Sequence, residues 1–511
     1  MPKVAVATSS ELAAEAAREV IELGGNAVDA ALAASALTMN TEPGVCAFSG
    51  GAIVTVWPPD GRPVSFDGYV TVPGINNPSA EVKTDTVTMA YGGGVSTLIG
   101  AGSVAVPGSP AALDAARRQF GKLPLAALLA PSIRAARQGF PLPSACHYYL
   151  NYSAEPIFAR DPASKRALFP EGDTLLGAGE TMMIEGLADS LSCIAENGAR
   201  ALYEGEIGGA IIDYLSTRGS RMTMQDLNAY HVDIREAEEI PIGGWTLAVS
   251  PPPSIGGSML GAVMLGRAAD IPLLTVLRRA LQYRRRNLDY STDLPEDAKQ
   301  LLMLARTNIE KLSEFISSAT VHTSASDSNG LACAITASAG YGSGEVAPGT
   351  GLWLNNCLGE LELNRRGLEA GPAGARLPSN MSPSVARKGD RVIAIGSPGA
   401  DRITSAMAQT LDRVLLGGKS IGDAIEAPRI HAEAALEAMA NGYYAEQLYA
   451  EPGAVIEANV DVPVRYFENK SMFFGGVGAT MTHGTGDAAV LDAAADSRRN
   501  GRTVISTSVV G

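Results

Sequence analysis

The sequence predicts a layered α+β fold, and the order of its secondary-structure patterns carries that prediction. Helical periodicity dominates most of the first 318 residues, with two strand-like stretches between residues 52 and 66. From Thr320 onward, the pattern changes to strands with helical segments after them. A chain of 511 residues, with 46% hydrophobic and 18% charged residues, is long and apolar enough to bury a sizeable core.

Caps and apolar runs define the elements expected in the first part of the chain. Ser9 or Ser10 can cap a helix that stops at Gly24-Gly25, because serine oxygens accept hydrogen bonds from the free N–H groups of a first turn. The Ala-rich stretch 29–39 is apolar on most sides and predicts a buried helix. The other expectations are strands at 52–56 and 63–66, helices over most of 110–140 and 180–230, and two or three helices in 266–318.

A strand pair opens the second part of the chain. Residues 320–325 have the two-residue period of a strand, residues 330–338 predict a second strand, and DSNG at 327–330 is typical of a hairpin turn. A buried strand at 392–395 is expected next. It is followed by GSPG at 396–399 and by a helix over about 400–416.

Charge and cysteine content exclude several classes of function. The net charge of −14, without a long basic block, argues against a nucleic-acid partner, and the five arginines between Arg278 and Arg286 are expected on a solvated helix face. The five cysteines lie far apart without metal-ligand spacing, which predicts reduced thiols, no metal site and a cytoplasmic location. No apolar run has the length of a signal peptide or a membrane span, so no membrane partner is expected.

Two short motifs match known patterns only in part. Gly418-Lys419-Ser420 is half of a phosphate loop, but Arg413 stands where the first glycine is required. Gly418-x-Ser420-x-Gly422 has the letters of a serine-hydrolase elbow, yet it joins two helical segments, whereas the elbow follows a strand. Both are interpreted as an ordinary loop, and no cofactor is expected.

Thr320 is the main candidate for a catalytic residue, although alone it would be interpreted as the start of a strand. A threonine hydroxyl is a weak nucleophile unless a base lies beside it. If the chain is cut before Thr320, the new α-amine, with an intrinsic pKa of about 7.7–8.0, can act as that base. The polar stretch Ser317-Ser318-Ala319 suits the approach to such a cut.

Ten motifs in the same order make the chain resemble the γ-glutamyltransferase family. Residues 320–327 (TVHTSASD) are similar to the family's T-T-H-x-S-V-V-D, and residues 24–31 (GGNAVDAA) to its G-G-N-A-V-D-A-A. The others are Glu42-Pro43 with Gly50-Gly51, 106–108 (VPG), 251–257 (PPPSIGG), 348–351 (PGTG) with 355–356 (NN), 381–383 (MSP), 396–399 (GSPG), 427–431 (APRIH) and 494–499 (AADSRR).

The resemblance implies a four-layer αββα sandwich of the N-terminal-nucleophile (Ntn) hydrolase type. It also implies a precursor that cuts itself between Ala319 and Thr320. The large subunit, residues 1–319, and the small subunit, residues 320–511, would form one intertwined domain as a heterodimer, or a dimer of such heterodimers. The Thr320 hydroxyl would attack the Ala319 carbonyl, and the freed Thr320 would then form an acyl-enzyme with a small-molecule substrate.

The resemblance further assigns catalytic positions. Ser338 aligns with the threonine that orients the nucleophile, and Gly399 and Ala400 align with two glycines whose N–H groups form the oxyanion hole. The strand–turn–helix pattern over 392–416 independently provides free N–H groups for developing negative charge.

The expected substrate clamp departs from the family pattern. Relatives hold the glutamate carboxylate with the arginine of D-F-R-E-x-A-P, but residues 67–73 (DGYVTVP) have Tyr69 there, which removes a charge-assisted contact. Ser379 remains of a serine pair whose second member is Asn380. Glu360 replaces the aspartate that binds the amine.

Three functions stay open on the sequence alone. The leading one is an Ntn hydrolase acting on a non-glutathione metabolite, at an amide or a C–C bond beside a carbonyl, as in relatives that hydrolyse oxamate or release an oxalyl unit in antibiotic biosynthesis. The second is γ-glutamyl transfer with a relocated carboxylate clamp. The third is a non-enzymatic scaffold, against which the retention of Thr320, Ser338 and Gly399 counts.

Overall fold

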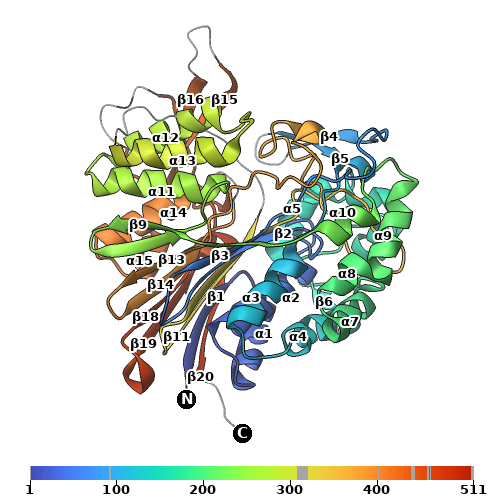
Figure 1. The fold of residues 1–511 in the computed structure, drawn as a ribbon, viewed down its shortest axis with the longest axis horizontal. Coiled ribbons are helices and arrows are strands. Elements are labelled where there is room, and N and C mark those ends of the chain that lie inside the picture. Colours follow the sequence, from blue (N-terminus) through green and yellow to red (C-terminus); the bar gives the residue numbers. More distant parts are fainter. Residues whose placement is uncertain are drawn as a thin grey trace.

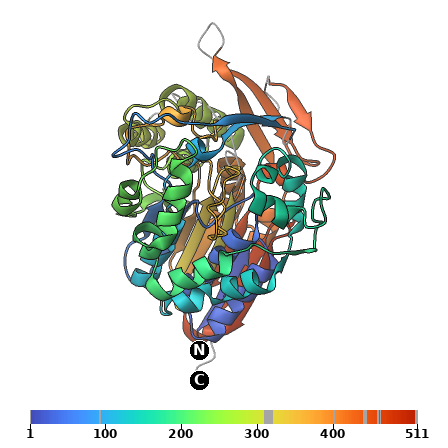
Figure 2. The ribbon, with the colours of Figure 1, turned by 90° about the vertical axis from the view of Figure 1, so that its right-hand side faces the viewer.

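Two antiparallel β-sheets stacked face to face form the centre of the fold, and helices cover the outside of both (Figures 1 and 2). The computed structural model describes residues 2–90, 94–307, 320–399, 402–438, 444–456, 460 and 462–507. The first sheet has the strand order β20-β1-β11-β12-β2-β3-β8, and the second has the order β19-β18-β14-β13-β10-β9.

The strands of the first sheet are β1 (Lys3–Thr8), β2 (Gly51–Trp57), β3 (Val64–Gly68), β8 (Asp233–Glu236), β11 (Val321–Asp327), β12 (Ala332–Ser338) and β20 (Arg502–Thr507). Those of the second sheet are β9 (Glu238–Ile242), β10 (Trp245–Val249), β13 (Ser384–Lys388), β14 (Arg391–Gly396), β18 (Gly478–His483) and β19 (Val490–Ala495). Smaller sheets contain β4 (Asp85–Met89), β5 (Val95–Ile99), β6 (Phe140–Pro141), β7 (Thr181–Met182), β15 (Ile430–Ala438), β16 (Tyr444–Ala450) and β17 (Val464–Tyr466).

The helices between β1 and β8 in sequence are α1 (Glu11–Glu22), α2 (Ala27–Thr41), α3 (Ser109–Phe120), α4 (Leu125–Gln138), α5 (Ser144–Ser153), α6 (Pro162–Leu168), α7 (Leu187–Asn197), α8 (Arg200–Glu204), α9 (Glu206–Ser216) and α10 (Met224–Ala229). The later helices are α11 (Ile255–Ala268), α12 (Leu273–Asn287), α13 (Leu294–Thr307), α14 (Arg402–Leu411) and α15 (Ile421–Glu426).

Separate sets of buried side chains fill the spaces between the four layers. One set joins the first sheet to the early helices, and another joins the second sheet to α11–α15. Between the sheets, small side chains such as Ala334 on β12 and Ala394 on β14 allow close packing. The expected α+β class and αββα layering are confirmed. None of the helices in the described ranges is both long and apolar enough to cross a membrane.

The first helix forms where its cap predicts it, and the second begins at Ala27, two residues before the expected start. Ser10 accepts a hydrogen bond from the Ala13 N–H at the start of α1. At the start of α2, Asn26 and Asp29 form a reciprocal capping box, which satisfies N–H groups that a first turn leaves free. All 15 residues of α2 are buried, because its alanines let the helix lie close to β11 and β12.

The expected strands at 52–56, 63–66, 320–325, 330–338 and 392–395 correspond to β2, β3, β11, β12 and β14. The expected helix over 400–416 begins in the described residues at Arg402 and changes to a π-helix at Asp412–Leu416. Residues 308–318, where helix was expected, lie outside the described residues. The loop at 418–420 joins two helices, and Ser420 caps α15, as expected of an ordinary connection.

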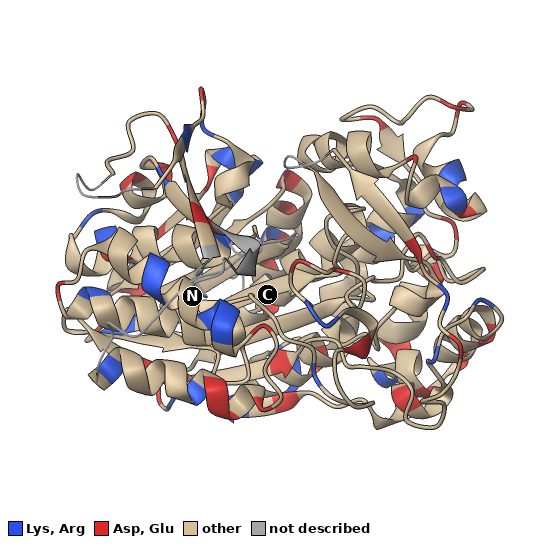
Figure 3. Ribbon diagram, turned by 90° about the horizontal axis from the view of Figure 1, so that it is seen from above, with Lys and Arg blue, Asp and Glu red and all other residues tan. Residues whose placement is uncertain are grey.

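The arginine-rich part of α12 is not the solvated face that the sequence suggested. Arg284 and Arg285 are buried, and each pairs with Asp289 at 2.7 Å. The expectation was wrong because Asp289, just beyond the helix, folds back and neutralises both charges in the interior. Seen from above, basic and acidic residues are interspersed along the ribbon (Figure 3).

Two distant motifs, residues 427–431 and 494–499, meet in a buried ion network. Asp496 pairs with Arg429 at 2.6 Å and with Arg498 at 3.1 Å, and Arg498 also pairs with Glu451 at 2.5 Å. Arg429 Nη1 donates a hydrogen bond to the Phe474 carbonyl at 3.0 Å. The network therefore fixes the segment around Phe474, which packs against the turn at 396–399.

Replacing Asp496 by alanine removes a carboxylate shared by two buried guanidinium groups. We expect Asp496→Ala to lower the free energy of unfolding by about 3–5 kcal/mol, because uncompensated buried charge is costly. Urea unfolding followed by circular dichroism measures this loss. The matched control is Glu236→Gln, which breaks an exposed pair with Arg62 and should cost less than about 1 kcal/mol. A loss for Asp496→Ala no larger than that of the control would contradict the network's role.

Candidate active site

Thr320 is buried directly before β11 and lies opposite Ser338. In the β11–β12 pair, Val321 faces Ala337 and His322 faces Thr336. Continuing this register by one residue brings Thr320 opposite Ser338, and opposed side chains share a face with Cβ atoms about 4.5–5.5 Å apart. The two hydroxyl residues therefore lie side by side, while Ala319 lies outside the described residues.

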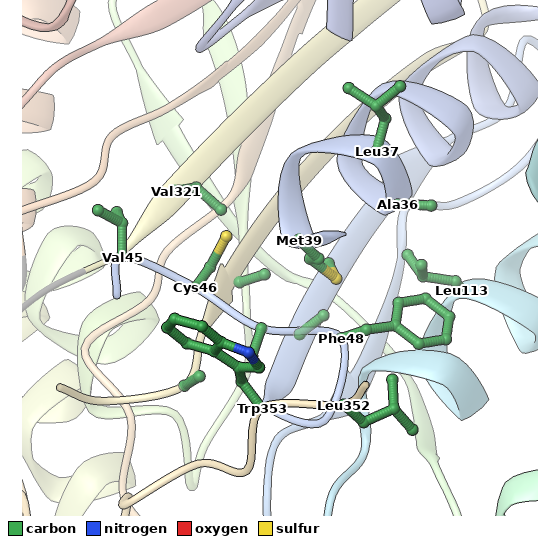
Figure 4. Close-up of a cluster of buried hydrophobic side chains, with 14 of the residues drawn as sticks. Ala36, Leu37, Met39, Val45, Cys46, Phe48, Leu113, Val321, Leu352 and Trp353 are labelled. Atoms are coloured by element: carbon green, nitrogen blue, oxygen red, sulfur yellow. The ribbon is translucent and has the colours of Figure 1, made fainter. Parts of the chain in front are cut away.

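The residues after Thr320 alternate between the two faces of the sheet. Val321 packs in an apolar cluster with Val45 and Cys46 on the helix side (Figure 4). His322 points the other way, towards the second sheet, where a Cβ added to Gly396 would lie 2.2 Å from its ring. Thr320 therefore starts the row of side chains that faces the second sheet.

His322 is a neutral link between the sheets. Its Nε2 lies 2.7 Å from Ser324 Oγ, which donates to the Gly478 carbonyl, so Nε2 carries the ring proton. Nδ1 then accepts from Thr336 Oγ1 at 2.9 Å. Burial lowers the pKa of His322 to about 3, so the ring stays uncharged at neutral pH.

The turn at 396–399 requires glycine at position 399. Gly399 has φ +117°, and a Cβ added there would lie 2.9 Å from Gly475 Cα, so both conformation and space require glycine. Ser397 Oγ accepts a hydrogen bond from Gly476 N at 3.2 Å, which ties the turn to the neighbouring segment. Ala400, the other expected oxyanion donor, lies outside the described residues.

Tyr69 and Glu360 lie near the end of β12, and Cys357 joins them. A Cβ added to Gly51, the strand partner of Ser338, would lie 2.5 Å from the Tyr69 ring. Burial, with the Cys357 thiol hydrogen-bonded to the phenol, raises the pKa of Tyr69 well above its usual value. The Glu360 carboxylate is buried beside Gly340. No motif in the sequence pointed to Cys357.

Ser379 and Asn380 lie between the segment that follows Tyr69 and the start of α11. Leu377 N donates to the Val70 carbonyl at 3.0 Å, and Gly256 N donates to the Ser379 carbonyl at 2.9 Å. A Cβ added to Gly256 would lie 2.1 Å from the Asn380 carbonyl oxygen. The close approach explains the glycine pair in PPPSIGG.

Arg376, which sequence reasoning missed, is the guanidinium that contacts Tyr69. Its Nη1 donates to the Tyr69 carbonyl at 2.5 Å and to the Tyr230 hydroxyl at 2.7 Å. Ion pairs at 3.8 Å and 3.5 Å join it to Asp67 and Asp233. Arg376 is thus held by protein groups on several sides.

A cavity of about 230 Å³ borders Thr320 on the β1 side. Glu42 lines it, with Oε1 accepting from Ser9 Oγ at 2.5 Å, and burial raises the pKa of Glu42 to about 7. Arg499 Nη1 donates to the Thr320 carbonyl at 3.3 Å.

In the described ranges, no three His, Cys, Asp or Glu side chains gather as metal ligands would.

The four-layer αββα sandwich is the architecture of the Ntn-hydrolase type. The chain belongs to the gamma-glutamyltranspeptidase family, whose sequence profile matches residues 13–276 and 267–506. It is 29% identical over 465 residues to the Acylase ACY 1 proenzyme of Pseudomonas sp. (strain V22), with 84% of this chain and 82% of the relative covered. It is also 29% identical over 473 residues to the Glutathione hydrolase proenzyme of Pseudomonas aeruginosa, with 84% and 82% covered.

Solved structures share the fold. Cephalosporin acylase from Bacillus halodurans superposes with a TM-score of 0.75 at 23% identity, covering 98% of this chain and 95% of that one. The structure of LmbA2991HD has a TM-score of 0.76 at 20% identity, with 98% of both chains covered.

The raised pKa of Glu42 makes stability depend on pH. Between pH 4.5 and about 7 the unfolded chain releases this proton before the folded chain does, so the wild type loses stability as pH rises. We expect Glu42→Gln to be more stable than the wild type at pH 8 by on the order of 2–3 kcal/mol, and much less so at pH 4.5. Thermal unfolding at both pH values measures the difference. For the exposed Glu15→Gln control, we expect the same difference in stability from the wild type at both pH values. An equal difference for Glu42→Gln at both pH values would contradict the prediction.

Proposed function

We propose that the chain is a self-processing Ntn hydrolase with Thr320 as its nucleophile. The single observation that carries the proposal is the position of Thr320, which is buried at the start of a central strand and opposite Ser338. The names of relatives as proenzymes support processing into two parts. The parts would be residues 1–319 and 320–511.

In the precursor, Thr320 Oγ attacks the Ala319 carbonyl, the C–N bond breaks, and the resulting ester is hydrolysed by water. The mature residue then has a free α-amine, which takes the hydroxyl proton as Oγ attacks a substrate carbonyl. N–H groups of the turn at Gly399 and Ala400 stabilise the oxyanion. The protonated amine gives its proton to the leaving group, and water releases the acyl group. Ser338 orients the Thr320 hydroxyl from the neighbouring strand.

The proposed substrate is a small non-glutathione metabolite, cut at an amide or at a C–C bond beside a carbonyl. Relatives are named as an acylase as well as glutathione hydrolases, so the family accommodates different acyl groups. Tyr69 stands where the resemblance expects a carboxylate-binding arginine, and it is buried with Cys357 in an apolar cluster. That surrounding supports an acyl group other than γ-glutamyl, such as an oxamate-like or oxalyl unit.

γ-Glutamyl transfer is the second candidate, favoured by the relatives named glutathione hydrolase. It requires another cation to hold the glutamate carboxylate. Arg376 contacts the Tyr69 backbone, but its guanidinium is already bound to Tyr230 and to the His231 carbonyl and paired with Asp233. This arrangement favours the first candidate.

Removing the Thr320 hydroxyl should abolish both processing and turnover. We expect wild type to give two bands on denaturing electrophoresis, the smaller beginning Thr-Val-His, and Thr320→Ala to give one band with activity at least ~10³-fold lower. Thr320→Ser keeps a hydroxyl and should still be cut. An uncut wild type with full activity, or a cut alanine variant, would overturn the proposal and favour a scaffold or another nucleophile.

Restoring arginine at position 69 tests the substrate proposal. We expect Tyr69→Arg to raise kcat/KM on a γ-glutamyl anilide by about 10–100-fold, because a charge-assisted carboxylate contact contributes about 1.5–3 kcal/mol. Tyr69→Phe controls for the change in packing and should bring no gain. Wild-type activity on this anilide equal to that of an ordinary glutathione hydrolase would instead support γ-glutamyl transfer.

A further inference from the structure

The cavity beside Thr320 lies on the flank away from Ser338. β11 pairs with β12 on one edge and with β1 on the other, and Thr8 and Ser9 at the end of β1 line the cavity. Glu42 and Arg499 line it as well. Thr320 thus has Ser338 on one side and the cavity with Glu42 and Arg499 on the other.

Glu42 is an unfavourable residue at this place unless it has a role. The residue is 5% exposed, and it directly follows α2, where the negative end of the helix dipole opposes a carboxylate. It is nevertheless built into the site, since Ser9 Oγ donates to it at 2.5 Å. Buried acids that face such costs often serve catalysis.

Arg499 connects Glu42 to Thr320. Its Nη1 donates to the Thr320 carbonyl at 3.3 Å, and its charge acts on the Glu42 carboxyl. Glu42, Thr320 and Arg499 line the same cavity, so one guanidinium lies near both residues. A change in the charge of Glu42 must change how strongly Arg499 is held near Thr320.

We propose that Glu42 is a positioning residue for Thr320 that acts through Arg499. The ionised carboxylate anchors the guanidinium, and the guanidinium fixes the carbonyl of the nucleophile residue. Protonation of Glu42 releases that anchor. The proposal rests on the proposed function, and it assigns to the E-P motif a role that the nucleophile, Ser338 and the Gly399 turn leave open.

The charged and titratable groups around Glu42 come from several elements of the described structure, and Glu11, Asp496 and Arg502 also line the cavity. Arg499 faces it from the C-terminal segment, Cys46 from the loop after α2, and Cys146 from α5. Burial raises the pKa of both thiols well above their usual value, so they stay neutral. His322, which also lines the cavity, is neutral because burial lowers its pKa to about 3.

Self-cleavage tests the proposal without a known substrate. Full-length precursor is made by cell-free translation and is unfolded by adding urea. It is then diluted into buffers from pH 5.5 to 9, and the appearance of the small subunit is followed by electrophoresis. For wild type, we expect the cleavage rate to fall by about tenfold in all between pH 8 and 5.5, with its midpoint near pH 7, and to level off at the rate of Glu42→Gln. Glu42→Gln should be about tenfold slower at pH 8 and flat between pH 5.5 and 7, while Glu42→Asp should keep the decline.

Two controls separate positioning from a general loss of structure. Glu345→Gln changes a half-buried carboxyl whose pKa burial also raises, in a different cavity, and should keep the wild-type profile. On an Arg499→Lys background, Glu42→Gln should cause little further loss, because the two residues act as one unit. Additive losses, or an unchanged acid decline in Glu42→Gln, would overturn the proposal while cleavage by Thr320 still stood. A wild type that never cuts would defeat the proposed function as well.

Discussion

The antiparallel pairing of β11 with its neighbours is the constraint on which the rest of the structure depends. β11 lies between β1 and β12, and β12 in turn pairs with β2. Strands from before residue 320 and after it therefore alternate within one hydrogen-bonded sheet. A cut before Thr320 would leave these ladders intact, since β1–β11 and β12–β2 connect the two parts through backbone groups. The two parts that such a cut would produce would therefore stay intertwined.

The same register decides what surrounds the nucleophile residue. Even-numbered residues of β11 face the second sheet, where the room for a side chain is small. His322 fits there because Gly396 and Gly478 on the opposing strands have no side chains of their own. Its hydrogen bonds to Ser324 and Thr336 then hold the ring uncharged between the sheets. The histidine of the TVHTSASD motif thus supports the position of Thr320 and leaves acid–base work to other groups.

Local features of the fold could be predicted from the sequence, and contacts between distant segments could not. The cap of α1 and the hairpin at 327–330 depend on residues a few positions apart, so the sequence predicts them. The burial of Arg284 and Arg285 depends on Asp289 folding back, which no periodicity reveals. Likewise, Glu42 and Arg499 come from opposite ends of the chain and meet only through the strand order. Motif resemblance pointed to Thr320 and Ser338, but only the register brings them opposite each other.

The backbone at position 69 is held independently of its side chain. The Tyr69 N–H donates to Asp67 Oδ1 at 3.0 Å, and the Tyr69 carbonyl accepts from Arg376 Nη1 at 2.5 Å. Both partners lie outside the β11–β12 pair that contains Thr320 and Ser338. A substitution at position 69 therefore changes the side chain beside Gly51, the strand partner of Ser338, without removing these backbone contacts. On the other flank, Glu42 and Arg499 interact with the Thr320 region itself, so variation there is expected to affect the reaction more than the choice of acyl group.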